Sequence, residues 1–166
     1  GRTDADPPPE GGEAAAASLG GPVGLVHAGR LIDAFRAGAT TPVEVAERAL
    51  AAIEADEASP RPLRAFIRRD AEEVRALAAA SAARYRQGAP LGPLDGVPVA
   101  VKDEVDQRGY PTTVGTRFLG TKPAASDATL VKRLRAAGAV LLGKTNMHEI
   151  GINPTGVNIT FGHVRN

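Results

Sequence analysis

Lys102 ends an apolar run and is the strongest candidate for chemistry in the sequence. Residues 96–101 (GVPVAV) predict a buried strand, and Lys102 and Asp103 follow it directly. A lysine at a strand end is most often a surface residue paired with a neighbouring charge. A desolvated lysine, however, shifts its pKa readily, and its neutral amine can accept a proton. Because lysine replaces histidine as the base for some serine nucleophiles, proton transfer is the chemistry that Lys102 could perform.

Residues 138–145 (GAVLLGKT) match the phosphate-binding pattern G-x-x-x-x-G-K-[ST] letter by letter. A true phosphate loop follows a strand, and its N–H groups face the bound anion. Here the intervening residues are Ala-Val-Leu-Leu, a strand sequence, and residues 127–137 before them predict a helix. Nucleotide binding at 138–145 therefore stays only as the remote alternative enzyme class.

The three histidines, His27, His148 and His163, lack the spacing of metal ligands, and His148-Glu149 has no second histidine of a zinc helix. We interpret them as ordinary surface or core residues, and the sequence predicts no metal site. The chain has no cysteine, which excludes a thiol nucleophile. A formal net charge of +1, from 20 basic and 19 acidic residues, argues against a nucleic-acid binder.

Helices and buried strands must position Lys102. Periodic apolar residues predict four helices, over residues 25–37, 42–56, 64–87 and 126–137. Continuous apolar runs predict buried strands at 96–101 and 139–142, and residues 151–166 read as loop. A buried strand, a crossover helix and a second buried strand imply a sheet covered on both faces. The fold class is therefore α/β, with the N-terminal helices packed on the outside of the sheet.

Residues 1–24 form a Pro-, Gly- and Ala-rich segment that we expect to be flexible. The first residue is Gly, and Asn166 follows a motif-dense stretch, so both ends are typical of a fragment. No apolar run approaches the roughly 20 residues of a membrane span. The N-terminus also lacks the apolar centre of a signal peptide. We therefore expect a cytoplasmic location.

Five ordered motifs within residues 25–166 resemble those of the amidase-signature family. They are 94–103 (LDGVPVAVKD, similar to G-[VI]-P-x-x-x-K-D), 109–116 (GYPTTVGT, similar to G-x-x-T-T-x-G-[ST]), 127–140 (DATLVKRLRAAGAV), 143–149 (GKTNMHE) and 158–166 (NITFGHVRN). The resemblance implies that residues 25–166 are the N-terminal part of a single, truncated amidase-signature domain. Its helices would pack on part of a mixed, helix-covered sheet.

The resemblance implies hydrolysis of carboxylic amides to an acid and an amine or ammonia, through a Ser–cis-Ser–Lys triad and a serine acyl-enzyme. By similarity, Lys102 is the catalytic lysine, and neither a metal nor an organic cofactor is needed. Gly151, Ile152 and Asn153 would lie near the small-molecule amide. Asp103 and Asn146 would support the lysine loop through hydrogen bonds. A homodimer of the intact enzyme is compatible with the resemblance.

The family's Gly- and Ser-rich segment, which carries both triad serines, would lie beyond residue 166. The serines of the chain do not replace it; they are Ser18, Ser59, Ser81 and Ser126, in a linker, a turn, a helix and a helix cap. We therefore expect this chain alone to be inactive. The alternative is a non-catalytic truncated remnant or an assembly piece whose open sheet edge pairs with another chain. The sequence leaves open whether the parent is a general amidase or one component of an amidotransferase.

Overall fold

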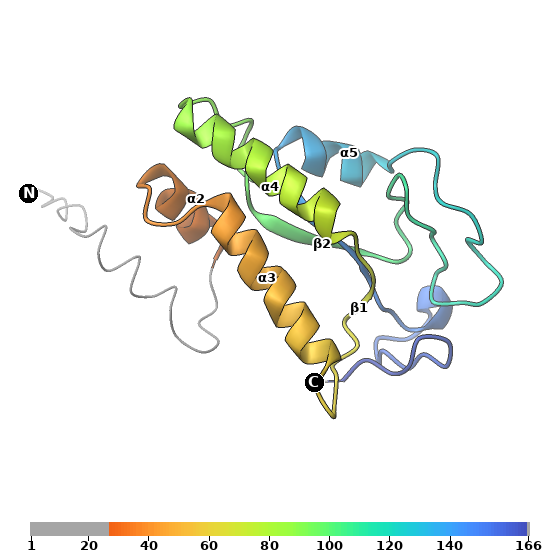
Figure 1. The fold of residues 1–166 in the computed structure, drawn as a ribbon. Helices are drawn as coiled ribbons and strands as arrows, with labels where there is room; N and C mark the ends of the chain where they lie inside the picture. The colour runs from red at the N-terminus through yellow and green to blue at the C-terminus, as the bar shows by residue number, and fades with distance from the viewer. Residues whose placement is uncertain (1–26, 166) are drawn as a thin grey trace, which may run out of the picture.

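The computed structural model describes residues 27–165, and the segment predicted to be flexible, 1–24, lies outside them. The helices are α2 (Ala28–Arg36), α3 (Pro42–Glu57), α4 (Ala71–Arg86), α5 (Thr129–Ala136) and the 3-10 turn η1 (Glu149–Gly151). The strands are β1 (Phe66–Arg68), β2 (Pro98–Lys102) and β3 (Val140–Thr145), as Figure 1 shows. The predicted α/β class is confirmed. Among residues 27–165, every helix is too short or too polar to cross a membrane.

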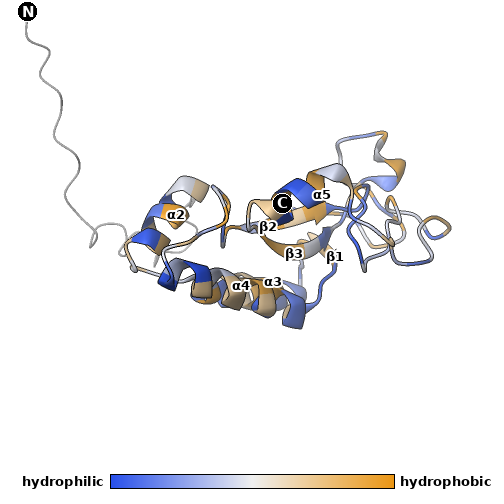
Figure 2. Ribbon diagram, turned by 90° about the horizontal axis from the view of Figure 1, so that it is seen from above, coloured by the Kyte–Doolittle hydropathy of each residue, from blue (hydrophilic) through white to orange (hydrophobic). Residues whose placement is uncertain are grey.

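The sheet is mixed, with strand order β1-β3-β2. Strands β2 and β3 run parallel, and Lys102 pairs with Thr145 where both strands end. Strand β1 is antiparallel to β3. Helices α3 and α4 cover one face of the sheet and α5 covers the other (Figure 2).

Strand β3 supplies apolar side chains to both faces. Val140 and Leu142 pack with α3 and α4, whereas Leu141 packs with α5. This alternation follows from the period of two in a strand. Both faces are therefore buried, which is why the strand sequence is continuously apolar, as predicted.

Helix α3 begins as its sequence predicts. Thr41 accepts a hydrogen bond from the Glu44 N–H, and the Glu44 carboxylate accepts one from the Thr41 N–H. Pro42 occupies the first turn, where its missing N–H costs nothing. This local arrangement places α3 against the sheet with Ala46 and Leu50 in the core.

The prediction of one helix over 64–87 is wrong, because its first part is strand β1. Arg64 has a φ of 55°, which a right-handed helix does not tolerate. Residues 66–68 pair instead with the end of β3. Asp70 then caps α4 by accepting hydrogen bonds from the N–H groups of Glu72 and Glu73. Pairing with a strand far along the chain overrides the local helical pattern.

Strand β3 is also longer than predicted, since it continues through Gly143 and Lys144 to Thr145. A glycine is required there because β1 approaches closely. A Cβ at Gly143 would lie 2.3 Å from the Arg68 carbonyl oxygen. Helix α5 starts at Thr129, later than the predicted 126, because the Asp127 carboxylate binds the Arg108 N–H and Arg135 instead of capping the helix.

Asp95, just ahead of β2, connects helix α4 to the segment that leads into the strand. Its buried carboxylate accepts two hydrogen bonds from Arg84 of α4, at 2.8 and 2.6 Å, and one from the Leu91 N–H. Burial would raise the pKa of Asp95, but Arg84 and the other donors hold it below its usual value. Gly138, after α5, has a φ of 86°, and a Cβ there would lie 2.6 Å from the Asp95 Cγ. The start of β2 and the turn before β3 are thus fixed to each other.

Replacing Gly138 with alanine should therefore destabilise the protein more than the same change at Gly88. Both glycines follow a helix with positive φ, but open space surrounds Gly88. We expect Gly88→Ala to lower the free energy of unfolding by about 1–2 kcal/mol, because an L-residue is strained in left-handed backbone. Gly138→Ala should lose about 1–3 kcal/mol more through overpacking against Asp95. Urea denaturation measures both, and equal losses would contradict the close contact.

Candidate active site

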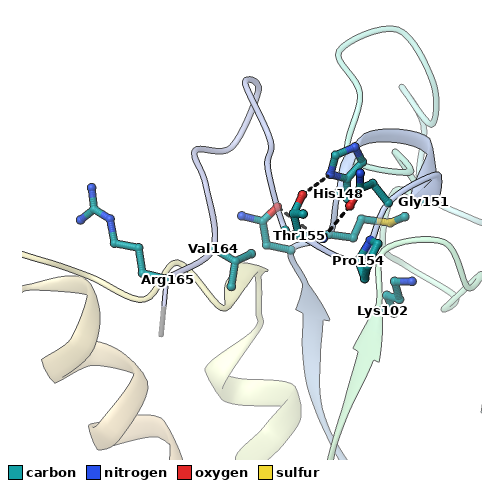
Figure 3. Close-up of a pocket in the computed structure, with 11 residues that line it drawn as sticks. Lys102, His148, Gly151, Pro154, Thr155, Val164 and Arg165 are labelled. Atoms are coloured by element: carbon teal, nitrogen blue, oxygen red, sulfur yellow. Dashed lines mark hydrogen bonds between the residues drawn. The ribbon is translucent and has the colours of Figure 1, made fainter.

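Lys102 stands at the carboxyl end of β2, beside a pocket of about 350 Å³ (Figure 3). Its side chain is 49% exposed, and its Nζ lies 2.9 Å from the Glu104 Oε1. The other walls come from the segment 146–156 and from Val164 and Arg165. Ligands of open α/β sheets bind outside the carboxyl ends of the strands, and this pocket has that position.

Most of the predicted site residues meet at this pocket. Gly151, Asn153 and Asn146 line it together with Lys102. Ile152 is not among the lining residues and is 82% exposed. Asp103 is fully buried instead. The structure thus brings four of the six predicted residues to one cavity.

Several lining residues were not predicted as site residues: Met147, His148, Pro154, Thr155, Gly156, Val164 and Arg165. His148, interpreted from the sequence as an ordinary residue, is half-buried, and its Nδ1 lies 3.2 Å from the Thr155 Oγ1. Most of them belong to the loop that carries Gly151 and Asn153, so continuity along the chain was the signal that could have found them. Among residues 27–165, no cluster of His, Cys, Asp and Glu could hold a metal ion.

The buried carboxylate of Asp103 binds the loop 113–115 through hydrogen bonds. It accepts hydrogen bonds from the N–H groups of Thr113 and Gly115, at 3.3 and 3.2 Å, and from the Thr113 hydroxyl. In the main chain, the Asp103 N–H donates to the Thr145 carbonyl, and its own carbonyl accepts from the Val114 N–H. Asp103 therefore connects the end of β2 to β3 and to this loop.

Lys144 lies within β3 and is fully buried, so it cannot serve a phosphate loop. Its Nζ donates to the Val105 carbonyl at 2.6 Å and lies 3.7 Å from the Asp103 Oδ1. Burial lowers the pKa of Lys144, while the carboxylates of Asp103 and Asp106 oppose that shift. The extended conformation of 140–145 agrees with the sequence argument against nucleotide binding.

Asn146 fixes the start of the segment 146–156, which lines the pocket and is called the pocket loop below. Its amide donates to the carbonyls of Arg64 and Gly162, at 3.2 and 2.9 Å, and its side-chain oxygen accepts from the Met147 N–H. The exit of β3 is thereby tied to the segment before β1 and to the C-terminal loop.

Asn158 is a second anchor, because its side chain donates two hydrogen bonds and accepts two. Its amide donates to the carbonyls of Gly115 and Met147, both at 2.9 Å. Its side-chain oxygen accepts from the N–H groups of Thr160 and Phe161, both at 2.8 Å. Asn158 therefore joins the loop held by Asp103 to the loop that lines the pocket.

Of the serines within residues 27–165, none lines the pocket beside Lys102. Ser81 is fully buried in α4, and Ser126 is exposed ahead of α5. Ser59 lies in the turn after α3. The described residues thus offer a lysine at the pocket without a serine beside it.

The family model described as Amidase matches residues 44–166. The chain is 42% identical over 134 residues to a fatty acid amide hydrolase of Arabidopsis thaliana, covering 80% of this chain and 22% of that protein. It is 48% identical over 102 residues to a glutamyl-tRNA(Gln) amidotransferase component of Salinispora arenicola (strain CNS-205), covering 61% and 21%. The chain thus spans about a fifth of the length of these relatives.

Solved structures of other proteins share this fold. The peptide amidase of Stenotrophomonas maltophilia superposes with a TM-score of 0.76 at 32% identity, over 86% of this chain and 30% of that one. A chain from a vestigial protein complex related to the origins of an s-triazine catabolic enzyme gives a TM-score of 0.77 at 40% identity, over 85% and 30%.

Removing the Asn158 side chain should loosen the pocket loop. Asn158→Ala leaves two buried carbonyls and two N–H groups without these partners, so we expect a loss of about 2 kcal/mol or more in the free energy of unfolding. The exposed Asn153→Ala should change it by no more than about 0.5 kcal/mol. A denaturation series that ranks the two variants equally would refute the anchoring role.

Proposed function

The chain belongs to the amidase family, and on that basis we propose that it supplies the catalytic lysine of an enzyme that hydrolyses carboxylic amides to an acid and an amine or ammonia. The observation that carries the proposal is the position of Lys102. It lies at the carboxyl end of a parallel strand, with its amine beside a pocket.

In the proposed reaction, Lys102 exchanges a proton with a bridging serine. That serine takes the proton of a second serine, whose oxygen attacks the amide carbonyl. Backbone N–H groups hold the oxyanion that forms, and the proton taken from the second serine passes to the amide nitrogen, so the C–N bond breaks and the neutral amine leaves. Water then attacks the acyl-enzyme, which releases the acid and returns a proton to the serine. Both serines would come from polypeptide other than residues 27–165, so we propose that this chain alone does not hydrolyse amides.

The surroundings of Lys102 suit such a role. Its partner Glu104 is 42% exposed, and an ion pair between exposed groups is weak, so the amine can change partner at low cost. Asp103 and Asn146 would act as positioning residues, because their hydrogen bonds hold the two segments that flank the pocket.

The pocket lining favours Gly151 and Asn153 as substrate contacts. We also propose Ile152 as a substrate contact, made once further polypeptide or a substrate covers its exposed side chain.

The second candidate function is a non-catalytic assembly piece. Large apolar side chains stand exposed on the loops at the pocket end of the sheet, with Phe118 at 68%, Ile152 at 82% and Ile159 at 73%. Such exposure favours burial by further polypeptide. That polypeptide would be the rest of the same chain in an intact amidase and a different chain in an assembly piece. The identity of the covering polypeptide therefore distinguishes the two functions.

The nucleotide sequence after codon 166 distinguishes the two candidates. We expect the reading frame to continue into a Gly- and Ser-rich segment of the G-G-S-S-[GS]-G type. A stop codon directly after residue 166 would instead favour the assembly piece.

Lys102→Ala is the activity test, made in the protein encoded by the whole reading frame. We expect kcat/KM for an amide substrate to fall by about 10²–10⁴-fold, since a proton-transfer group contributes that much. The free energy of unfolding should change by less than about 0.5 kcal/mol, because the side chain is half exposed. Lys122→Ala, at another exposed lysine, is the matched control and should keep full turnover. Hydrolysis at the parental rate by Lys102→Ala would eliminate the proposed role.

A further inference from the structure

A second lysine, Lys144, is hydrogen-bonded to the turn that begins at Lys102. The Lys102 carbonyl accepts a hydrogen bond from the Val105 N–H at 3.0 Å, which closes the turn. The Val105 carbonyl in turn accepts from the Lys144 Nζ at 2.6 Å. Two successive hydrogen bonds therefore link the buried amine of β3 to the main chain of Lys102.

The same amine reaches the loop that follows the turn. Its Nζ lies 3.4 Å from the Thr112 Oγ1 and 3.7 Å from the Asp103 Oδ1. Asp103 holds Thr113 and Gly115, as described above. The polar partners of the Lys144 amine thus belong to the segment that directly follows Lys102.

That segment is strained where it meets the pocket loop. Val114 and Ile150 have φ values of 53° and 58°, in a region that β-branched residues rarely occupy. The Ile150 N–H donates to the Val114 carbonyl at 2.9 Å, so the two strained residues are joined to each other. Such conformations persist only where surrounding contacts impose them, and they cluster at functional sites.

Stability alone does not explain a buried lysine at position 144. Both charged groups of the Lys144–Asp103 pair are fully buried, and taking them out of water costs more than an apolar pair would. Replacing a buried ion pair by apolar residues of similar volume is often neutral or stabilising. The pair is better explained by the geometry that it imposes.

We propose that Lys144 is a positioning residue for the reaction of Lys102. Through Val105 it holds the turn that carries Lys102, and through Asp103 it holds the Val114–Ile150 contact at the side of the pocket. The inference rests on the proposed amide hydrolysis, but its structural part has a readout that does not depend on activity.

The test uses Lys144→Met in the protein encoded by the whole reading frame, with the exposed Lys132→Met of α5 as the matched control. We expect kcat to fall by about 100-fold in Lys144→Met, as for other small displacements of reacting groups, with little change in KM. Hydrogen exchange at the amides of Val105, Val114 and Ile150 should become about tenfold faster. Lys132→Met should match the parent in both measurements.

Each outcome decides the proposal. A folded Lys144→Met with parental kcat overturns the positioning role, whatever its exchange rates are, and unchanged exchange overturns the structural link. If Lys102→Ala keeps its hydrolysis, the proposed function fails, and exchange in Lys144→Met still decides whether the lysine holds the turn.

Should Lys144→Met not fold, Thr113→Val replaces it, because this isosteric change removes only the hydroxyl bonded to Asp103. It should lower kcat by about tenfold and speed exchange at Val114. A folded Thr113→Val that matches the parent in both measurements overturns the proposal.

Discussion

The buried carboxylate of Asp103 is the contact on which the geometry around the pocket depends. A buried carboxylate needs donors, and here they come from the loop 113–115, while the ammonium of Lys144 on the neighbouring strand lies 3.7 Å away as its counter-charge. Asp103 directly follows Lys102. The hydrogen bonds of Asp103 therefore hold the end of β2 against both the loop 113–115 and the end of β3. Burial of Asp103 thus holds Lys102 in place together with the strand pairing of Lys102 and Thr145.

Apolar packing and polar hydrogen bonds fix different parts of this fold. The alternating side chains of β3 align the helices on the two faces of the sheet but do not determine where the strands start and end. Asp95 and Gly138 fix the start of the parallel pair, whereas Asp103, Asn146 and Asn158 fix the loops where it ends. The pocket lies at the end where the polar anchors are densest, and loops positioned by a rigid scaffold are where binding residues usually occur.

Local signals in the sequence predicted much of this arrangement. The capping box at Thr41 predicted α3, and the apolar run before Lys102 predicted β2. The features that the sequence did not predict depend on contacts between residues far apart in the chain. Strand β1 forms because β3 pairs with it, and Asp70, the N-cap of α4, was the one local signal that the helix begins after it. Lys144 and Asp103 are far apart in the sequence, so a buried ion pair between them is invisible until the strands are aligned. The motif around Lys144 could have drawn attention to it, but its phosphate-loop resemblance pointed to the wrong chemistry.

The role proposed for Lys102 is to transfer a proton, beyond placing a positive charge at the pocket. Lys102→Arg separates the two, because the guanidinium keeps the charge but does not give up its proton in proteins. The decisive measurement is kcat/KM of Lys102→Arg beside that of Lys102→Ala, in the protein encoded by the whole reading frame. We predict that both variants lose kcat/KM to the same extent, by about 10²–10⁴-fold. An arginine variant that retains most of the parental kcat/KM would contradict proton transfer by Lys102.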